Sequence, residues 1–290
     1  MGYHKIFLTL ALLFCLSSSA MSATGLKMLT VEAGARPAGM GGAFAAVGGD
    51  PYAAAYNPAA TWGITQATAS VGYNTHWENS HIENAFISFH KKSVVVTGGL
   101  LFAGVNDIEK RTAPTSDFIG FDAHDVSLKL GAAFELEENY YLGFGLGYMY
   151  EKIDTYTGGA FNFDVGLLVT PHPDINIGLA VLNFGSTVNL RNESFDLPTS
   201  YRGGVVYRYD AFRAAADVVN LDGTTHLHVG GEFEAYQGFL LRAGYRTGYD
   251  TKDFSAGAGF TKRNLRVDYA FLPYGGNLGN AHMINLTFQI

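Results

Sequence analysis

Short segments in which apolar and polar residues alternate recur from about residue 66 to the end of the chain. In the last of them, Ile284, Leu286 and Phe288 alternate with Asn285 and Thr287. A period of two residues is typical of a β-strand with one apolar and one polar face. About 14 such segments start near residues 66, 84, 94, 125, 140, 161, 175, 200, 212, 225, 238, 253, 264 and 282. The sequence therefore predicts an all-β fold of about 14 strands.

The connections between these segments alternate in length. The short ones are 91–92, 137–139, 171–174, 210–211, 236–238 and 262–264. The longer ones include 105–122, 152–160, 184–199 and 272–281. Outer-membrane barrels of bacteria have short periplasmic turns and longer outer loops, whereas a soluble β-sandwich has no reason to alternate in this way. We therefore predict a transmembrane antiparallel β-barrel in the outer membrane of a Gram-negative-type bacterium. An even strand number places both termini in the periplasm.

The first 23 residues have the features of a secretory signal peptide. Lys5 precedes an apolar run over residues 6–16, and a stretch of small residues follows. Cleavage fits after Ala20 or after Ala23. The apolar run is about 11 residues long and too short to span a bilayer, which disfavours an uncleaved anchor. The sequence thus predicts a signal peptide over residues 1–23 and an exported mature chain.

The composition excludes several other classes of protein. A hydrophobic share of 48% argues against disorder, and a formal net charge of −7 without a basic run argues against a nucleic-acid partner. The one cysteine, Cys15, lies within the signal peptide, so the mature chain has no disulfide. Phe14 precedes it, where a lipoprotein would have a small residue. After the signal peptide no run of 18 apolar residues occurs, so any membrane crossing must use strands.

The alternation assigns side chains to the two faces of the predicted wall. The lipid-facing set is Tyr201, Val205, Tyr207, Tyr209, Phe212, Val229, Phe233, Phe239, Leu241 and Tyr245. The lumen-facing set is Gly143, Gly145, Gly147, Arg202, Arg208, Arg213, Asp217, Glu232, Glu234, Arg242, Arg246, Arg266 and Asp268. Its charges are of both signs, so they form either a salt-bridged interior or a selectivity lining. The three glycines form a bare stripe that permits close approach by something inside the barrel.

Residues 24–64 do not alternate and are rich in Gly and Ala. Turn signals occur at residues 48–51 and at Asn57-Pro58. Small residues allow tight packing in a confined space, so we expect this segment inside the barrel or across its periplasmic mouth. We treat residues 24–64 as an N-terminal hatch and 65–290 as the barrel. The candidate hatch residues are Gly39, Gly41, Gly42, Asn57 and Pro58.

Two stretches of the hatch resemble a known family. Residues 34–44 (GARPAGMGGAF) and 55–60 (AYNPAA) resemble the N-terminal part of FadL-like outer-membrane proteins, and most of all their PorV/PorQ branch. Residues 240–246, 254–260, 267–271 and 278–282 resemble the closing strands of that branch. The resemblance implies a 14-stranded barrel with an N-terminal hatch. It further implies one of two activities. FadL moves long-chain fatty acids across the outer membrane, and PorV handles cargo in type IX secretion.

Other chemistry finds little support in the sequence. His226 and His228 share a strand face with two glutamates and would need a third ligand to bind zinc, so we interpret them as polar residues of the lumen or the rim. No Gly-x-Ser-x-Gly motif occurs, and Ser127 and Ser255 have no identifiable base. We therefore expect no enzyme activity, no cofactor and no metal site.

The leading hypothesis is a non-enzymatic barrel of PorV/PorQ type that acts in transport or protein export. The first alternative is a FadL-like channel for long-chain fatty acids or other hydrophobic solutes, and the second is a structural or surface-adhesion barrel. Expected partners are outer-membrane lipid, the barrel-assembly machinery, and either secreted proteins or hydrophobic small molecules. The outer loops are shorter than a secretion shuttle implies.

Overall fold

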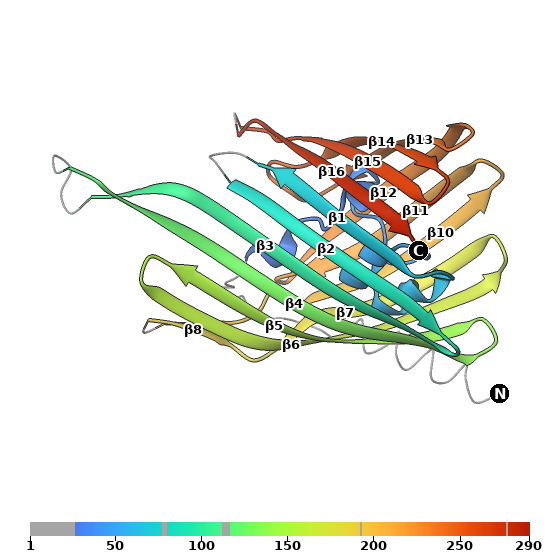
Figure 1. The fold of residues 1–290 in the computed structure, drawn as a ribbon, viewed down its shortest axis with the longest axis horizontal. Helices are drawn as coiled ribbons and strands as arrows, with labels where there is room; N and C mark the ends of the chain where they lie inside the picture. The colour runs from blue at the N-terminus through green and yellow to red at the C-terminus, as the bar shows by residue number, and fades with distance from the viewer. Residues whose placement is uncertain (1–26, 77–79, 112–116, 192, 277) are drawn as a thin grey trace.

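In the part of the chain that the structure describes, fourteen antiparallel strands close into one barrel (Figure 1). The computed structural model describes residues 27–76, 80–111, 117–191, 193–276 and 278–290, so the predicted signal peptide lies outside the described residues. The barrel strands are β1 (Thr68–Thr75), β2 (Ser80–Lys91), β3 (Val94–Lys110), β4 (Ile119–Glu137), β5 (Tyr140–Ile153), β6 (Tyr156–His172), β7 (Ile175–Gly185), β10 (Ser200–Tyr209), β11 (Phe212–Leu221), β12 (Thr224–Tyr236), β13 (Phe239–Arg246), β14 (Phe254–Lys262), β15 (Leu265–Pro273) and β16 (Asn280–Gln289). The first strand pairs with the last, which confirms the predicted closed barrel.

The two ends of the barrel differ in their connections. At one end, which we call the short-turn end, two residues join each strand pair, at 92–93, 138–139, 173–174, 210–211, 237–238 and 263–264. Residues in the left-handed conformation, such as Asn139 (φ 69°) and Asp210 (φ 50°), make several of these reversals possible. The pairing of Thr68 with Gln289 places the start of β1 and the end of β16 at this same end.

At the opposite, long-loop end, two predicted loops are largely strand. β3 continues to Lys110 and β4 begins at Ile119, where we expected a loop over 105–122. Only residues 154–155 separate β5 from β6, where we expected a loop over 152–160. The strands extend because the pairing continues, as between Ile153 and Tyr156, and satisfies the backbone groups beyond the rim. β3 and β4 therefore project well past the rest of the barrel (Figure 1).

The loop between β7 and β10 is the exception, because it folds back over the barrel interior. It contains the hairpin of β8 (Val188–Leu190) and β9 (Glu193–Phe195). Val188 is fully buried and packs with Met149 and Ala160 of the inner wall. The hairpin therefore covers part of the lumen at the long-loop end.

The outer face of the barrel is apolar. Of the predicted lipid-facing residues, Val205, Tyr207, Tyr209, Phe212, Val229, Phe233, Phe239, Leu241 and Tyr245 are exposed, and Tyr201 is half-buried. An exposed apolar surface of this extent is typical of a face that contacts lipid or another protein. No helix in the described ranges has the length and hydropathy needed to cross a membrane.

Residues 27–64, which we call the inner segment, lie within the barrel (Figure 1). They form η1 (Lys27–Thr30), α2 (Ala35–Gly39), η2 (Pro51–Ala55) and η3 (Pro58–Gly63). Asp50 and Asn57 cap η2 and η3 by accepting backbone N–H groups, and a proline follows each cap. The turn signals in the sequence are thus the starts of two short helices.

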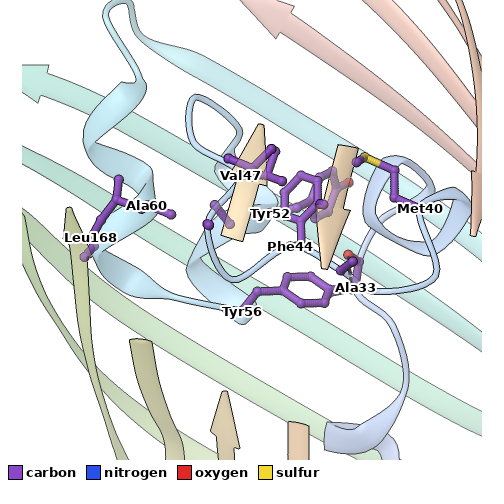
Figure 2. Close-up of a cluster of buried hydrophobic side chains, with 14 of the residues drawn as sticks. Ala33, Met40, Phe44, Val47, Tyr52, Tyr56, Ala60 and Leu168 are labelled. Atoms are coloured by element: carbon purple, nitrogen blue, oxygen red, sulfur yellow. Dashed lines mark hydrogen bonds between the residues drawn. The ribbon is translucent and has the colours of Figure 1, made fainter. Parts of the chain in front are cut away.

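The core of the molecule lies between the inner segment and the wall. Phe44, Tyr52 and Tyr56 of the segment gather in one buried cluster, to which Leu168 of β6 and Phe86 of β2 belong (Figure 2). The rings of Phe44 and Tyr56 are 5.5 Å apart, and those of Tyr52 and Phe86 are 5.0 Å apart. This apolar contact holds the segment against strands that are distant in sequence.

Glycines line the wall where the inner segment passes. A Cβ atom at Gly143 would collide with the backbone of Ala59, and one at Gly230 would collide with that of Met40. Further wall glycines that a Cβ would push into the segment are Gly166, Gly178 and Gly244. The segment therefore packs backbone to backbone against the wall, which side chains would prevent.

Candidate functional site

A network of buried arginines and carboxylates joins the inner segment to the wall. Arg36 of α2 donates from Nε and Nη2 to the two carboxylate oxygens of Glu232, both at 2.8 Å. Arg242 Nε also donates to Glu232 at 2.7 Å, and Arg213 is a third partner. Glu232 is only 3% exposed. One carboxylate of β12 therefore receives three guanidinium groups, which offset the cost of its burial.

The network continues across α2 to the other side of the segment. Arg36 Nη1 donates to Asp50 at 3.0 Å, and Arg266 of β15 donates to the same oxygen at 2.6 Å. Arg266 Nε also donates to Asp268 at 2.7 Å. Asp50 and Asp268 are buried. The charges of the segment are thus paired with the wall over several strands.

A second cluster lies beside the first, toward the long-loop end. Glu32 of the inner segment pairs with Arg246 of β13 and lies 3.5 Å from Lys252 Nζ in the β13–β14 loop. His228 Nε2 is 2.9 Å from the hydroxyl of Tyr249, which belongs to the same loop. Glu32, Arg246 and His228 are buried. This cluster connects the segment, the wall and the β13–β14 loop.

Acid is expected to loosen the inner segment. Burial would raise the pKa of Glu32 and of Asp50, but Arg246 beside Glu32 and Arg266 beside Asp50 outweigh burial and hold both pKa values below their ordinary 4.5 and 3.8. Because the folded pKa lies below the unfolded one, this stabilisation is present above about pH 4.5 and is lost as the pH falls. The unfolding temperature in detergent should be flat from pH 7 to about pH 5 and should fall below about pH 4. An unfolding temperature that stays flat to pH 3 would contradict this.

A cavity of about 50 Å³ lies between the inner segment, the wall and the β13–β14 loop. Its apolar side chains are Met28, Leu29, Val31, Ala33, Ala55, Leu101, Leu182 and Leu221. Its polar and charged side chains are Thr30, Glu32, Tyr56, Lys129, Asn183, Ser200, Arg202, His228 and Tyr249. A space of this size holds a few water molecules at most.

Arg202 is the cation in this cavity with the weakest contact to an acidic group, because the buried carboxylate of Asp217 interacts with it only beyond salt-bridge distance. Within the described part of the chain it forms no ion pair, and its Nε is buried without a hydrogen bond. Its guanidinium lies 5.1 Å from the ring centre of Tyr56 and donates weakly to the carbonyl of Gly42 at 3.5 Å. Lys129, by contrast, donates to Asp164 at 2.6 Å. Arg202 therefore has an unused hydrogen-bond donor at Nε.

The structure brings some predicted site residues together and separates others. Glu232, Arg242, Arg266 and Asp268 form the first network, Arg246 belongs to the second cluster, and Arg202 lines the cavity. Glu234 and Arg208 lie near the short-turn end. Glu234 accepts the Gly238 N–H at 2.8 Å, and Arg208 donates to the carbonyl of Pro173 at 2.7 Å.

The predicted glycine stripe of β5 has two different neighbours. Gly143 contacts the backbone of the inner segment, as described above. Gly145 and Gly147 lie beside the side chains of Asp164 and Asn162, and so make room for a polar group inside the wall. Across this gap Lys129 of β4 reaches Asp164 of β6.

The predicted hatch residues are buried contacts to the wall. The Gly41 N–H donates to Ser255 Oγ at 3.1 Å, and Asn57 Nδ2 donates to the carbonyl of Leu167 at 3.0 Å. A Cβ at Gly42 would lie 3.0 Å from His228 Nδ1, and one at Gly39 would lie 3.2 Å from Gly257. Pro58 begins η3 directly after its Asn57 cap.

Sequence reasoning missed the segment's own charged residues and the loop residues that meet them. Glu32, Arg36 and Asp50 are the charged residues between positions 28 and 64, where Gly, Ala and apolar residues predominate. That contrast was an available signal, because an isolated charge in a buried segment needs a partner. Tyr249 and Lys252 gave no such signal, since they lie in an ordinary polar loop.

His226 and His228 pack against Tyr249. The His226 ring stacks on that of Tyr249 at 3.9 Å, and His228 bonds to its hydroxyl. No group of three or more His, Cys, Asp or Glu side chains placed to hold a metal ion occurs in the described ranges.

Comparison with known proteins shows a shared fold. No protein-family model and no curated protein matches the sequence. The crystal structure of the toluene transporter TodX of Pseudomonas putida superposes with a TM-score of 0.68 at 12% identity, covering 92% of this chain and 98% of that one. A FadL homologue of Pseudomonas aeruginosa gives a TM-score of 0.66 at 12% identity, covering 93% and 100%. The chain thus has the fold of these FadL-type barrels over nearly its whole length.

Proposed function

We propose that the protein is a non-enzymatic channel of the outer membrane that passes a hydrophobic small molecule, with the inner segment as its hatch. The observation that supports this most is the cavity enclosed jointly by the inner segment and the wall. TodX, which has the same fold, is a toluene transporter. The exposed apolar face would contact membrane lipid, and the long-loop end would face outward, which leaves both termini in the periplasm. The barrel-assembly machinery would insert the chain.

A channel with so small a cavity would require the inner segment to move. Sites for small ligands usually measure about 300–1,000 Å³, and this cavity measures about 50 Å³. On this proposal the structure is the closed state of the channel. Close glycine contacts, polar contacts and the apolar cluster around Phe44, Tyr52 and Tyr56 hold the segment against the wall. On this proposal these contacts separate while the strand pairing stays intact.

The lining of the cavity indicates the kind of solute. Leu101 and Leu182 offer an apolar surface, and Arg202 offers a cation with an unused hydrogen-bond donor. An amphipathic solute with an acidic head, such as a long-chain fatty acid, would satisfy both. Its carboxylate would accept hydrogen bonds from the Arg202 guanidinium.

Uptake by cells that lack their own fatty-acid channel tests this function. Cells that carry the protein should take up labelled oleate faster than cells without it. Because a hydrogen bond to a charged group contributes about 1.5–3 kcal/mol, Arg202→Met should lower oleate uptake roughly 10-fold or more while toluene uptake stays unchanged. Arg208→Met, at the short-turn end, is the matched control. If cells with the protein take up neither solute faster than cells without it, the proposed channel function is wrong.

A second candidate function is cargo handling in protein export, as in the PorV/PorQ branch. The supporting observation is the tall wall at the long-loop end. β3 has 17 residues and β4 has 19, whereas a membrane-spanning strand needs about 9–11. Phe118 and Ile119 are exposed on this projection, at 53% and 68%. Such a surface above the membrane suits a protein partner.

Capture experiments separate the two candidates. The purified barrel should retain secreted proteins through their C-terminal domains if it handles cargo, and a Phe118→Ser, Ile119→Ser variant should lose them. Co-purified lipid together with oleate uptake would instead support the channel. If neither activity is detected, the remaining candidate is a structural or adhesion barrel.

A further inference from the structure

The loop between β13 and β14, residues 247–253, is fixed at its base and turned inward. Arg246 N–H donates to the carbonyl of Asp253 at 2.7 Å, which closes the loop on itself. Thr247 N–H donates to the carbonyl of Leu227 on β12 at 2.9 Å. Gly275 N–H, from the next loop, donates to the carbonyl of Thr251 at 2.8 Å. With its backbone held in this way, the loop directs side chains over the lumen.

Tyr249 is the side chain that covers the cavity. Its ring stacks on His226 with centres 3.9 Å apart and planes 10° apart, and its hydroxyl meets His228 Nε2 at 2.9 Å. The Lys252 ammonium lies 4.7 Å from the centre of the same ring. Gly248 turns the chain above His226 with φ +79°, a conformation that suits glycine. Tyr249 is therefore seated between the wall and the loop's own lysine.

Lys252 joins this loop to the inner segment. Its Nζ lies 3.5 Å from Glu32 Oε1, and the side chains of Lys252 and Glu32 are 17% and 6% exposed. Burial lowers the pKa of Lys252, and Glu32 opposes that effect. In the described residues Glu32 is the acidic partner of Lys252, whereas Glu32 also pairs with Arg246. Moving either the loop or the segment would leave a buried charge with fewer partners.

We propose that loop 247–253 is a lid on the cavity and that the Lys252–Glu32 ion pair couples its opening to release of the inner segment. A lid that lifts takes Lys252 away from Glu32 and weakens the hold of the wall on the segment. A segment that leaves takes Glu32 away from Lys252 and weakens the lid. Coupling of this kind is reciprocal by thermodynamic necessity. Entry of the solute from outside and its passage through the barrel would then be linked. This proposal rests on the channel function proposed above.

Hydrogen exchange of the folded protein in detergent, without solute, tests this coupling independently of transport. The lid reporters are the Thr247 and Gly275 amides. The segment reporters are the Ala35 amide, which donates to Asn285 Oδ1 at 2.5 Å, and the Gly41 amide. Lys252→Met should speed exchange at least 10-fold at both sets, whereas Lys252→Arg should retain wild-type rates. Lys262→Met, in a strand end far from the lid, is the matched control.

The reverse variant completes the test. Glu32→Gln should speed exchange in the lid, and the double variant Glu32→Gln, Lys252→Met should exchange no faster than the faster single variant. Faster exchange in the lid alone for Lys252→Met would overturn the coupling, even if oleate uptake is normal. Heat-modifiable gel mobility shows that each barrel is closed before the rates are compared.

Discussion

Alanine at Gly230 is expected to displace the inner segment from the wall, whereas alanine at the adjacent Gly231 should leave it in place. A Cβ at Gly230 points into the barrel and collides with the Met40 backbone. A Cβ at Gly231 points outward and meets the nearest atom, in the ring of Phe212, at 3.5 Å. Overpacking of this kind costs about 1–3 kcal/mol, and here it acts on the docked segment and leaves the strand pairing intact. The displaced population should rise roughly 5- to 150-fold.

Thiol labelling measures this displacement, since the chain's own cysteine, Cys15, lies within the predicted signal peptide. A cysteine at Ala43, which is fully buried in the segment, should label faster in the Gly230→Ala background and at the unchanged rate in the Gly231→Ala background. Equal labelling rates in both backgrounds would show that docking of the segment does not depend on the absence of a side chain at Gly230. If the segment is the hatch, the first variant should also leak small hydrophobic solutes.

The fold was predictable from the sequence because barrels repeat local rules. The alternation around residues such as Ile284 and Leu286 indicates which face of the strand each side chain is on. A two-residue turn such as Asp210-Ala211 indicates the short-turn end of the barrel. Local patterns gave the strand starts near 94, 140, 175, 200 and 212 as observed. They failed at the long-loop end, where β3 and β4 continue as strands through residues that do not alternate clearly.

The interior was predictable only in part, because its contacts join residues that are far apart in sequence. Alternation could place Glu232 and Arg242 on the inner face, but it could not show that Arg36 lies between Glu232 and Asp50. Partners separated by 196 positions leave no local pattern. The glycine stripe showed that something approaches the wall at Gly143, and the structure identifies it as the backbone of the inner segment.

If the inner segment is released as proposed above, the charges of the interior lower the cost of that release. Apolar packing alone would hold the segment through a large buried area, as in any core. Here much of the attachment is through ion pairs such as that between Arg36 of the segment and Glu232 of the wall. Glu232 is also paired with another wall residue, Arg242. After Arg36 leaves, Glu232 keeps Arg242 and Arg213, and water entering the lumen solvates the rest. Release therefore costs less than the number of contacts suggests.

Replacing Glu232 by glutamine should strongly destabilise the protein, because it removes the common partner of three cations. Arg36, Arg242 and Arg213 would then repel one another in a buried site. Breaking a buried ion pair by removing one partner costs about 3–5 kcal/mol, so the unfolding temperature of the Glu232→Gln barrel should fall by many degrees. Its inner segment should label fast at every pH from 5 to 8, since the loss does not depend on protonation.

Glu234→Gln is the matched control, because it lies two residues further along the same strand. Glu234 is exposed and accepts the Gly238 N–H in a turn, so its loss should change stability by less than about 1 kcal/mol. If the Glu232→Gln barrel has the same unfolding temperature as the Glu234→Gln control, water already screens the arginines from one another. In that case the segment is held by its apolar cluster of Phe44, Tyr52 and Tyr56 and by the glycine wall, and opening must break those contacts instead.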